Sequence, residues 1–168
     1  MPRHPIDEVS VRVATPQDLD GVMALCMQVA KENGIFQPDV QKVVNDIWPT
    51  LHQADGLIGV IGPVGGELEG MVILKLGSLW YSSDRIVEER FVFVPPKFRK
   101  ASGGRARRLC QFTKRVADEL NMPLIIGVLS NSRTNGKMRL YESEFGPPAG
   151  GFFLYKTKTG EWSRQAAE

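Results

Sequence analysis

Basic residues and glycines gather in the stretch 99–105, which reads Arg-Lys-Ala-Ser-Gly-Gly-Arg. The apolar run 91–94 before it predicts the end of a buried strand, and the apolar spacing over 104–120 predicts an amphipathic helix. The first N–H groups of a helix have no partner within it, and the helix dipole places partial positive charge there. Gly103 and Gly104 lack the Cβ atoms that would keep a phosphate away from the backbone. The stretch therefore predicts a diphosphate-binding loop.

This loop differs from the two common nucleotide-binding loops. It lacks the Gly-x-x-x-x-Gly-Lys-Ser/Thr pattern of P-loop enzymes and the Gly-x-Gly-x-x-Gly pattern of dinucleotide folds. Residues 94–104, Val-Pro-Pro-Lys-Phe-Arg-Lys-Ala-Ser-Gly-Gly, resemble the acetyl-CoA loop of the GNAT N-acetyltransferases, which is roughly Val-x-Pro-x-x-Arg-x-x-Gly-x-Gly/Ala. Ser102 stands where the family usually has its first glycine, so the match has one departure.

A second motif of the same family follows in residues 137–146. GNAT proteins carry a helix that ends in Leu-Tyr-Glu-x-x-Gly-Phe and is followed by a strand. Here Leu140-Tyr141-Glu142 matches, the last pair is transposed to Phe145-Gly146, and residues 152–156 are expected to supply the strand. Two motifs in the same order along one chain occur by chance much less often than either motif alone.

The resemblance implies a fold and an activity. The fold would be an α/β (α+β) GNAT-type fold: a mixed, mostly antiparallel twisted sheet flanked by helices, whose fourth and fifth strands (86–94 and 124–129) splay apart around the pantetheine arm of CoA. The activity would be acetyl-CoA-dependent transfer of an acetyl group to a primary amine of an unidentified acceptor, by direct transfer with a general base.

Acetyl transfer to an amine needs a base, and two adjacent glutamates interrupt the apolar strand 86–94. Consecutive strand residues point to opposite faces, so one of Glu88 and Glu89 should face inward and could act as the base. Glu88 has the spacing to Val94 of the base in histone-type GNAT members, so the resemblance favours Glu88 over Glu89. An exposed cross-strand ion pair is the alternative for Glu88. Tyr141 matches the family tyrosine that protonates the leaving thiolate, and a core tyrosine is the alternative.

The remaining site residues follow from the resemblance. Acetyl-CoA is expected to contact Phe93, Val94, Arg99, Lys100, Ala101, Ser102, Gly103, Gly104 and Arg105, together with Asn131 or Asn135, between which the sequence does not choose. The acceptor site is expected at residues 31–38 and 77–85, where Phe36, Trp80 and Tyr81 offer aromatic surface. Trp80 could equally belong to the core or to a homodimer interface.

The hydrophobic pattern predicts one domain over residues 1–168, with loose tails at 1–8 and 163–168. The expected strands are 9–14, 57–61, 68–76, 86–94, 124–129 and 152–156. Four helices are expected: one that begins at Thr15 and ends at 33, one over 39–47 that Pro49 stops, one over 104–120 and one over about 136–143.

The composition of the chain limits the classes of protein to which it can belong. The chain has 168 residues, of which 42% are hydrophobic and 24% charged, with a net charge of +2. No apolar stretch has the length of a membrane helix or signal core, so we expect a cytoplasmic protein without a membrane partner. Cys26 and Cys110 lie on apolar helix faces and indicate core residues, and the histidines lack metal-ligand spacing.

Two other functions stay open. The basic stretch 97–108 could contact phosphates of nucleic acid, although a net charge of +2 does not favour this. The chain could also bind CoA without catalysis, because Ser102 and the Phe145-Gly146 order both depart from the GNAT pattern.

Overall fold

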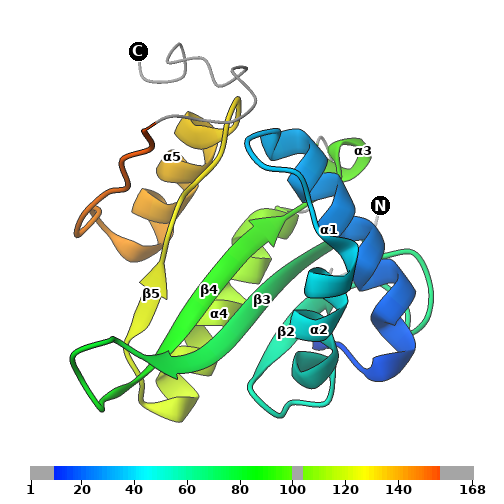
Figure 1. Ribbon diagram of the computed structural model, residues 1–168, viewed down its shortest axis with the longest axis horizontal. Coiled ribbons are helices and arrows are strands. Elements are labelled where there is room, and N and C mark those ends of the chain that lie inside the picture. The colour runs from blue at the N-terminus through cyan, green and yellow to red at the C-terminus, as the bar shows by residue number, and fades with distance from the viewer. Residues whose placement is uncertain (1–9, 100–103, 156–168) are drawn as a thin grey trace, which may run out of the picture.

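The computed structural model describes residues 10–99 and 104–155, and its centre is a five-stranded sheet (Figure 1). The strands lie in the order in which they occur in the chain: β1 Arg12–Val13, β2 Gly56–Ile61, β3 Gly70–Ser78, β4 Arg85–Phe93 and β5 Leu124–Ile126. Neighbouring strands are antiparallel except β4 and β5, which are parallel. The mixed, mostly antiparallel sheet expected from the sequence is confirmed.

Helices cover both faces of this sheet. They are η1 Pro16–Asp18, α1 Leu19–Asn33, α2 Val40–Leu51, α3 Pro96–Arg99, α4 Arg105–Leu120 and α5 Thr134–Phe145. In Figure 1, α1 and α2 lie on the near face, α4 lies behind the sheet, and α5 lies beyond β5 at its edge. None of these helices is long and apolar enough to cross a membrane.

The sheet separates two hydrophobic clusters, one for each helical layer. On the α1 and α2 side, Val22, Cys26 and Ile47 pack against Ile73 and Phe93 of the sheet. The α4 side is formed by further buried residues of the helices and the sheet: Leu109, Cys110, Phe112, Val116, Tyr141, Val72, Leu74, Val87 and Val92. Both cysteines are buried and unpaired, as the sequence predicted.

A bulge in β4 changes which face its residues present. Ile73 of β3 pairs with Phe91, but the next residue, Leu74, pairs with Glu89, so Arg90 has no partner in the β3 ladder. An extra residue of this kind shifts the alternation of side chains between the two faces. Glu89 consequently lies on the α4 and α5 side of the sheet.

The pairing of β4 with β5 is short. It joins Val87 to Leu124, Glu88 to Ile125 and Glu89 to Ile126, and β4 then continues to Phe93 without β5 beside it. The fifth strand is therefore shorter than the expected range 124–129. The two strands part at Glu89, next to the bulge.

The expected last strand, 152–156, is wrong for the residues that the structure describes, since 152–155 form no strand. The aromatic ring of Phe152 instead packs against the backbone of Gly127, where an added Cβ would lie 2.7 Å from Cε2 of the ring. Phe153 and Tyr155 stay exposed. An aromatic run favours a strand only where a neighbouring strand offers a packing surface.

The expected stop of the second helix before Pro49 is also wrong, because α2 continues through Pro49 to Leu51. Proline removes an N–H donor from a helix interior. In the same turn, the Asp46 carbonyl accepts from Thr50 Oγ1 at 3.1 Å and from Lys75 Nζ at 2.6 Å. The contact with Lys75 of β3 ties this end of α2 to the sheet.

Candidate active site

Two cavities lie against β4. The smaller, of about 390 Å³, lies between the end of β4, the start of α4 and α5. The larger, of about 1050 Å³, lies between β4, the C-terminal half of α1, α2 and the segment after β5. Lys137 and Tyr141 of α5 line both, so α5 connects the two cavities.

The N-terminus of α4 opens into the smaller cavity. Gly104 begins the helix with φ +57°, a left-handed conformation that favours glycine. The N–H of Arg108 donates to the Gly104 carbonyl at 3.0 Å, so the N–H groups of Arg105, Ala106 and Arg107 precede the first helical bond. All three residues line the cavity. A helix N-terminus that faces a cavity is compatible with the diphosphate site expected from the sequence, and that site stays a prediction.

Cations surround the same cavity. Within the described part of the chain, five basic side chains line it: Arg99, Arg105, Arg107, Arg133 and Lys137. Glu32 is the one carboxylate among the described lining residues, and its Oε2 accepts from Arg99 Nη2 at 2.6 Å. The balance of charge favours an anionic ligand.

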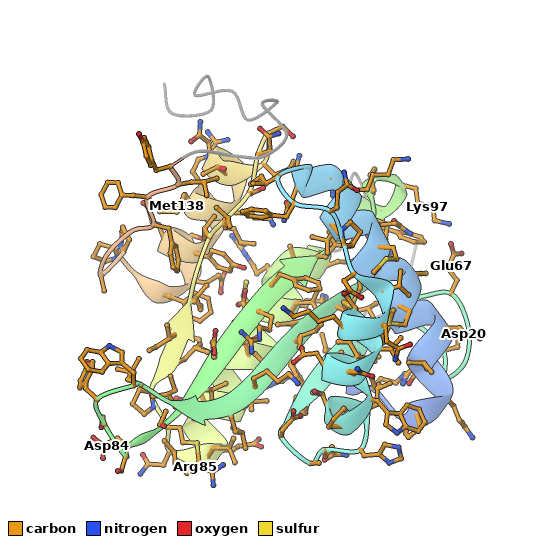
Figure 2. The ribbon with its side chains drawn as sticks, in the orientation of Figure 1. Asp20, Glu67, Asp84, Arg85, Lys97 and Met138 are labelled. Carbon is orange, nitrogen blue, oxygen red and sulfur yellow. The ribbon has the colours of Figure 1, made fainter. Side chains whose placement is uncertain are left out.

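Ion pairs hold the predicted cations in place. Arg99 also donates from Nε to the Val94 carbonyl at 2.8 Å, which fixes its side chain beside the end of β4. Arg105 donates from Nε to Glu69 Oε2 at 2.7 Å. Just outside the cavity lining, Lys97 pairs with Glu67 (Figure 2). These contacts position the guanidinium groups before any ligand arrives.

The residues expected to bind acetyl-CoA divide into three groups. Phe93, Val94, Arg99, Gly104 and Arg105 line the smaller cavity. Residues 100–103, with Lys100, Ala101, Ser102 and Gly103, lie outside the described residues. Asn131 and Asn135 line neither cavity.

A buried acid–tyrosine pair lies where the two cavities meet. The hydroxyl group of Tyr141 donates to Glu89 Oε1 at 2.6 Å, and Glu89 is 3% exposed. The second oxygen, Oε2, has no hydrogen-bond partner among the described residues. A buried carboxylate oxygen without a partner is costly and typical of functional sites.

Burial shifts the ionisation of this pair. It raises the pKa of Glu89 to about 7, although the Tyr141 hydrogen bond and the charge of Lys137 act in the opposite direction. Burial, followed by the charge of Glu89, raises the pKa of Tyr141. A carboxyl group with a pKa close to neutral can both accept and release protons under physiological conditions.

Glu88, the base favoured by the sequence, has a different environment. Its side chain is 44% exposed, and Oε1 accepts from Arg90 Nη1 at 3.1 Å. It lines the larger cavity, as Glu89 and Arg90 do. Both glutamates thus lie at the site, but Glu89 is the one that contacts Tyr141.

Lys137 and Arg133 are site residues that the sequence analysis did not identify. Residues at i and i+4 share a helix face, and Lys137 lies four residues before Tyr141 on α5. Desolvation lowers the pKa of Lys137, and the charges of Glu32 and Glu89 oppose this effect. Its ammonium group therefore belongs to the same electrostatic cluster as Glu89.

The expected acceptor residues lie apart from the larger cavity. Asn33, from the expected range 31–38, lines it, but Phe36, Trp80 and Tyr81 do not. Trp80 is 94% exposed, so its assignment to the core is wrong. The alternative assignment of Trp80 to a homodimer interface stays a prediction.

Comparison with known proteins gives no match by sequence but several by structure. No protein-family model and no curated protein matches the chain. The integron cassette protein HFX_CASS3, from the mobile metagenome of Cole Harbour Salt Marsh, has a TM-score of 0.68 and 19% identity, covering 93% of this chain and 96% of that one. AAC(6')-Iy in complex with the bisubstrate analogue CoA-S-monomethyl-acetylneamine has a TM-score of 0.67 and 14% identity, covering 89% and 97%.

A further acetyltransferase shows the same likeness. The aminoglycoside acetyltransferase meta-AAC0020, from an uncultured soil metagenomic sample and in complex with sisomicin, has a TM-score of 0.62 and 12% identity, covering 88% of this chain and 95% of that one. This chain has the GNAT fold. In the GNAT fold of this chain, the end of β4, which β5 leaves free, and the start of α4 line the smaller cavity.

Proposed function

We propose that this protein is an acetyl-CoA-dependent N-acetyltransferase in which Glu89 acts as the base and Tyr141 as the acid. The observation that carries the proposal is the buried hydrogen bond between Tyr141 and Glu89 at the junction of the two cavities. The GNAT fold supports it, and the sequence motifs around residues 94–104 and 140–142 agree with it. An acceptor in the larger cavity and a donor in the smaller one would meet at these two residues.

The smaller cavity fits the anionic and extended parts of acetyl-CoA. The N–H groups that precede the first helical bond of α4 and the surrounding cations suit a diphosphate. Beyond Glu89, the edge of β4 that β5 leaves free suits an extended amide chain, with Phe93 and Val94 as the expected partners. Bound acetyl-CoA would supply the thioester whose acetyl group is transferred.

Two protons leave the nitrogen when an ammonium becomes an amide, and one of them ends on the released thiolate. Glu89 accepts a proton from the acceptor amine, and Tyr141 donates its hydroxyl proton to the thiolate. Protonation of Glu89 removes the negative charge that helps to raise the Tyr141 pKa, so the tyrosine becomes a better donor at that moment. Glu89 then returns a proton to the Tyr141 phenolate, and the second proton reaches solvent.

The nucleic-acid alternative receives less support. Four basic residues of the stretch 97–108 are already paired with carboxylates: Lys97, Arg99, Arg105 and Arg107. Three of them, Arg99, Arg105 and Arg107, also line the smaller cavity, which suits one compact anion better than a row of nucleic-acid phosphates. A protein that only binds CoA would gain nothing from burying a glutamate without a full set of hydrogen bonds.

The function is tested by incubating the protein with acetyl-CoA and a mixture of primary amines. We expect release of free CoA thiol together with an acetylated amine detected by mass spectrometry. Saturable acetyl-CoA binding without thiol release across amine classes would instead support the non-catalytic module.

Tyr141→Phe is expected to lower kcat by about 10- to 100-fold while leaving the Kd for acetyl-CoA close to that of the wild type. The ring still packs, but the proton donor is lost. Tyr81→Phe removes a hydroxyl from an exposed tyrosine that lines neither cavity, and it should leave both constants unchanged. A Tyr141→Phe protein with unchanged kcat would assign Tyr141 to the core alone.

A further inference from the structure

The described lining of the larger cavity carries equal numbers of acidic and basic side chains. Among the described residues, three carboxylates line it, and each has a polar partner: Asp46 Oδ1 lies 3.3 Å from Lys75 Nζ, Glu88 pairs with Arg90, and Glu89 accepts from Tyr141. Lys42, Arg90 and Lys137 add positive charge to the same lining. Glu89 Oε2 is the one buried carboxylate oxygen without a partner among the described lining residues, so the lining offers a buried position for one ammonium group.

Apolar side chains form the solvent-facing rim of this cavity. Leu129 is 45% exposed, and Ile125 and Phe152 are also exposed although all three line the cavity. They belong to β5 and to the segments that follow it, and Phe152 rests on Gly127. Val43 of α2 and Phe91 of β4 extend the apolar surface inside. A ligand with an apolar body would remove this surface from water.

We propose that the acceptor is a small monoamine with an aromatic or aliphatic body, and not a polyamine. This inference rests on the proposed acetyltransferase function and names the substrate class of the same site. The single amine lies near Glu89, and the apolar body lies between Val43 and the rim at Leu129. Each additional ammonium of a polyamine would lie near Lys42 and Lys137, while the other two carboxylates of the described lining already pair with Lys75 and Arg90, which is unfavourable.

The experiment compares 2-phenylethylamine with spermidine as acceptors at saturating acetyl-CoA. We expect kcat/KM for 2-phenylethylamine to exceed that for spermidine by about tenfold or more. Thermal stabilisation of the CoA-bound protein by each amine gives a second readout that needs no turnover. A wild-type preference for spermidine in either readout would overturn the inference.

Two leucines of similar exposure provide a matched pair of variants. Leu129 lines the cavity, whereas Leu120, 41% exposed at the end of α4, does not. Leu129→Ala should raise KM for 2-phenylethylamine by about fivefold, and Leu120→Ala should leave it unchanged. Equal KM values for the two variants would place the apolar body elsewhere and contradict the inference.

A charge reversal tests the electrostatic part. Lys42 is exposed in the first turn of α2, where the helix dipole favours an acidic residue, so Lys42→Glu should fold. This change should raise the kcat/KM of spermidine relative to 2-phenylethylamine by about fivefold. An unchanged ratio would contradict the electrostatic argument.

Failure of acetyl-CoA to bind at all would refute the proposed function itself, whereas intact acetyl-CoA binding with a polyamine preference would refute the acceptor class alone.

Discussion

Glu89→Gln is expected to lower kcat for acetyl transfer by about 10²- to 10⁴-fold, the usual size of a general-base contribution. The amide oxygen can still accept the hydrogen bond from Tyr141, but the group cannot take a proton from the amine. The measurement is steady-state kinetics with an acceptor identified from the amine mixture. Glu88→Gln, one residue earlier, is the matched control and should leave kcat close to the wild-type value. The reverse result would assign the base to Glu88.

The pH profile and the stability of Glu89→Gln separate loss of chemistry from loss of structure. The base must be ionised, so wild-type activity should fall as pH decreases through about 7, the raised pKa of Glu89. A folded pKa above the ordinary 4.5 means that the folded state binds more protons, so the free energy of unfolding decreases as pH rises from 4.5 to about 7. Glutamine does not titrate, so the Glu89→Gln protein does not lose this part of the free energy of unfolding. Above pH 7, Glu89→Gln should therefore melt no lower than the wild type.

Gly104→Val is expected to abolish most of the stabilisation that acetyl-CoA gives, with Kd weakened by about 100-fold or more. Among the described residues, an added Cβ at Gly104 meets nothing closer than Arg107 Cβ at 4.0 Å, so these residues leave room for it. The side chain would instead occupy the space in front of the helix N-terminus, and valine strongly disfavours φ +57°. Thermal shift with increasing acetyl-CoA measures the effect.

Gly65 offers the matched control for backbone strain. It has φ +68° in the turn between β2 and β3 and lines neither cavity. Gly65→Val should lower the melting temperature of the free protein as Gly104→Val does, but it should retain the full increase on adding acetyl-CoA. A Gly104→Val protein that keeps this increase would remove the α4 N-terminus from the binding site.

The architecture could be predicted because local patterns and two motifs agree. Strands β2, β3 and β4 and helices α1 and α4 follow from their apolar spacing, and the structure confirms them near the expected bounds. The strand expected at 152–156 failed because an aromatic run does not specify its partner, and here Phe152 packs on Gly127 instead.

The choice between the two glutamates depended on a feature that the sequence does not reveal. Alternation left both glutamates possible and family spacing favoured Glu88, but the bulge at Arg90 shifts the alternation and Glu89 is the one that contacts Tyr141. A bulge depends on pairing with β3, a tertiary relation. Lys137, by contrast, could have been found, because it lies one helical turn before Tyr141 in the matched motif.

Binding of acetyl-CoA by the unmodified protein tests the central claim most directly, since it needs no knowledge of the acceptor. A ligand at 100 times its Kd stabilises the native state by about 2.7 kcal/mol, which for a domain of this size raises the melting temperature by about 5–10 °C. We predict this increase for acetyl-CoA and nearly the same increase for desulfo-CoA, which keeps the diphosphate. Stabilisation by a short DNA duplex, with none by acetyl-CoA at any concentration, would contradict the account.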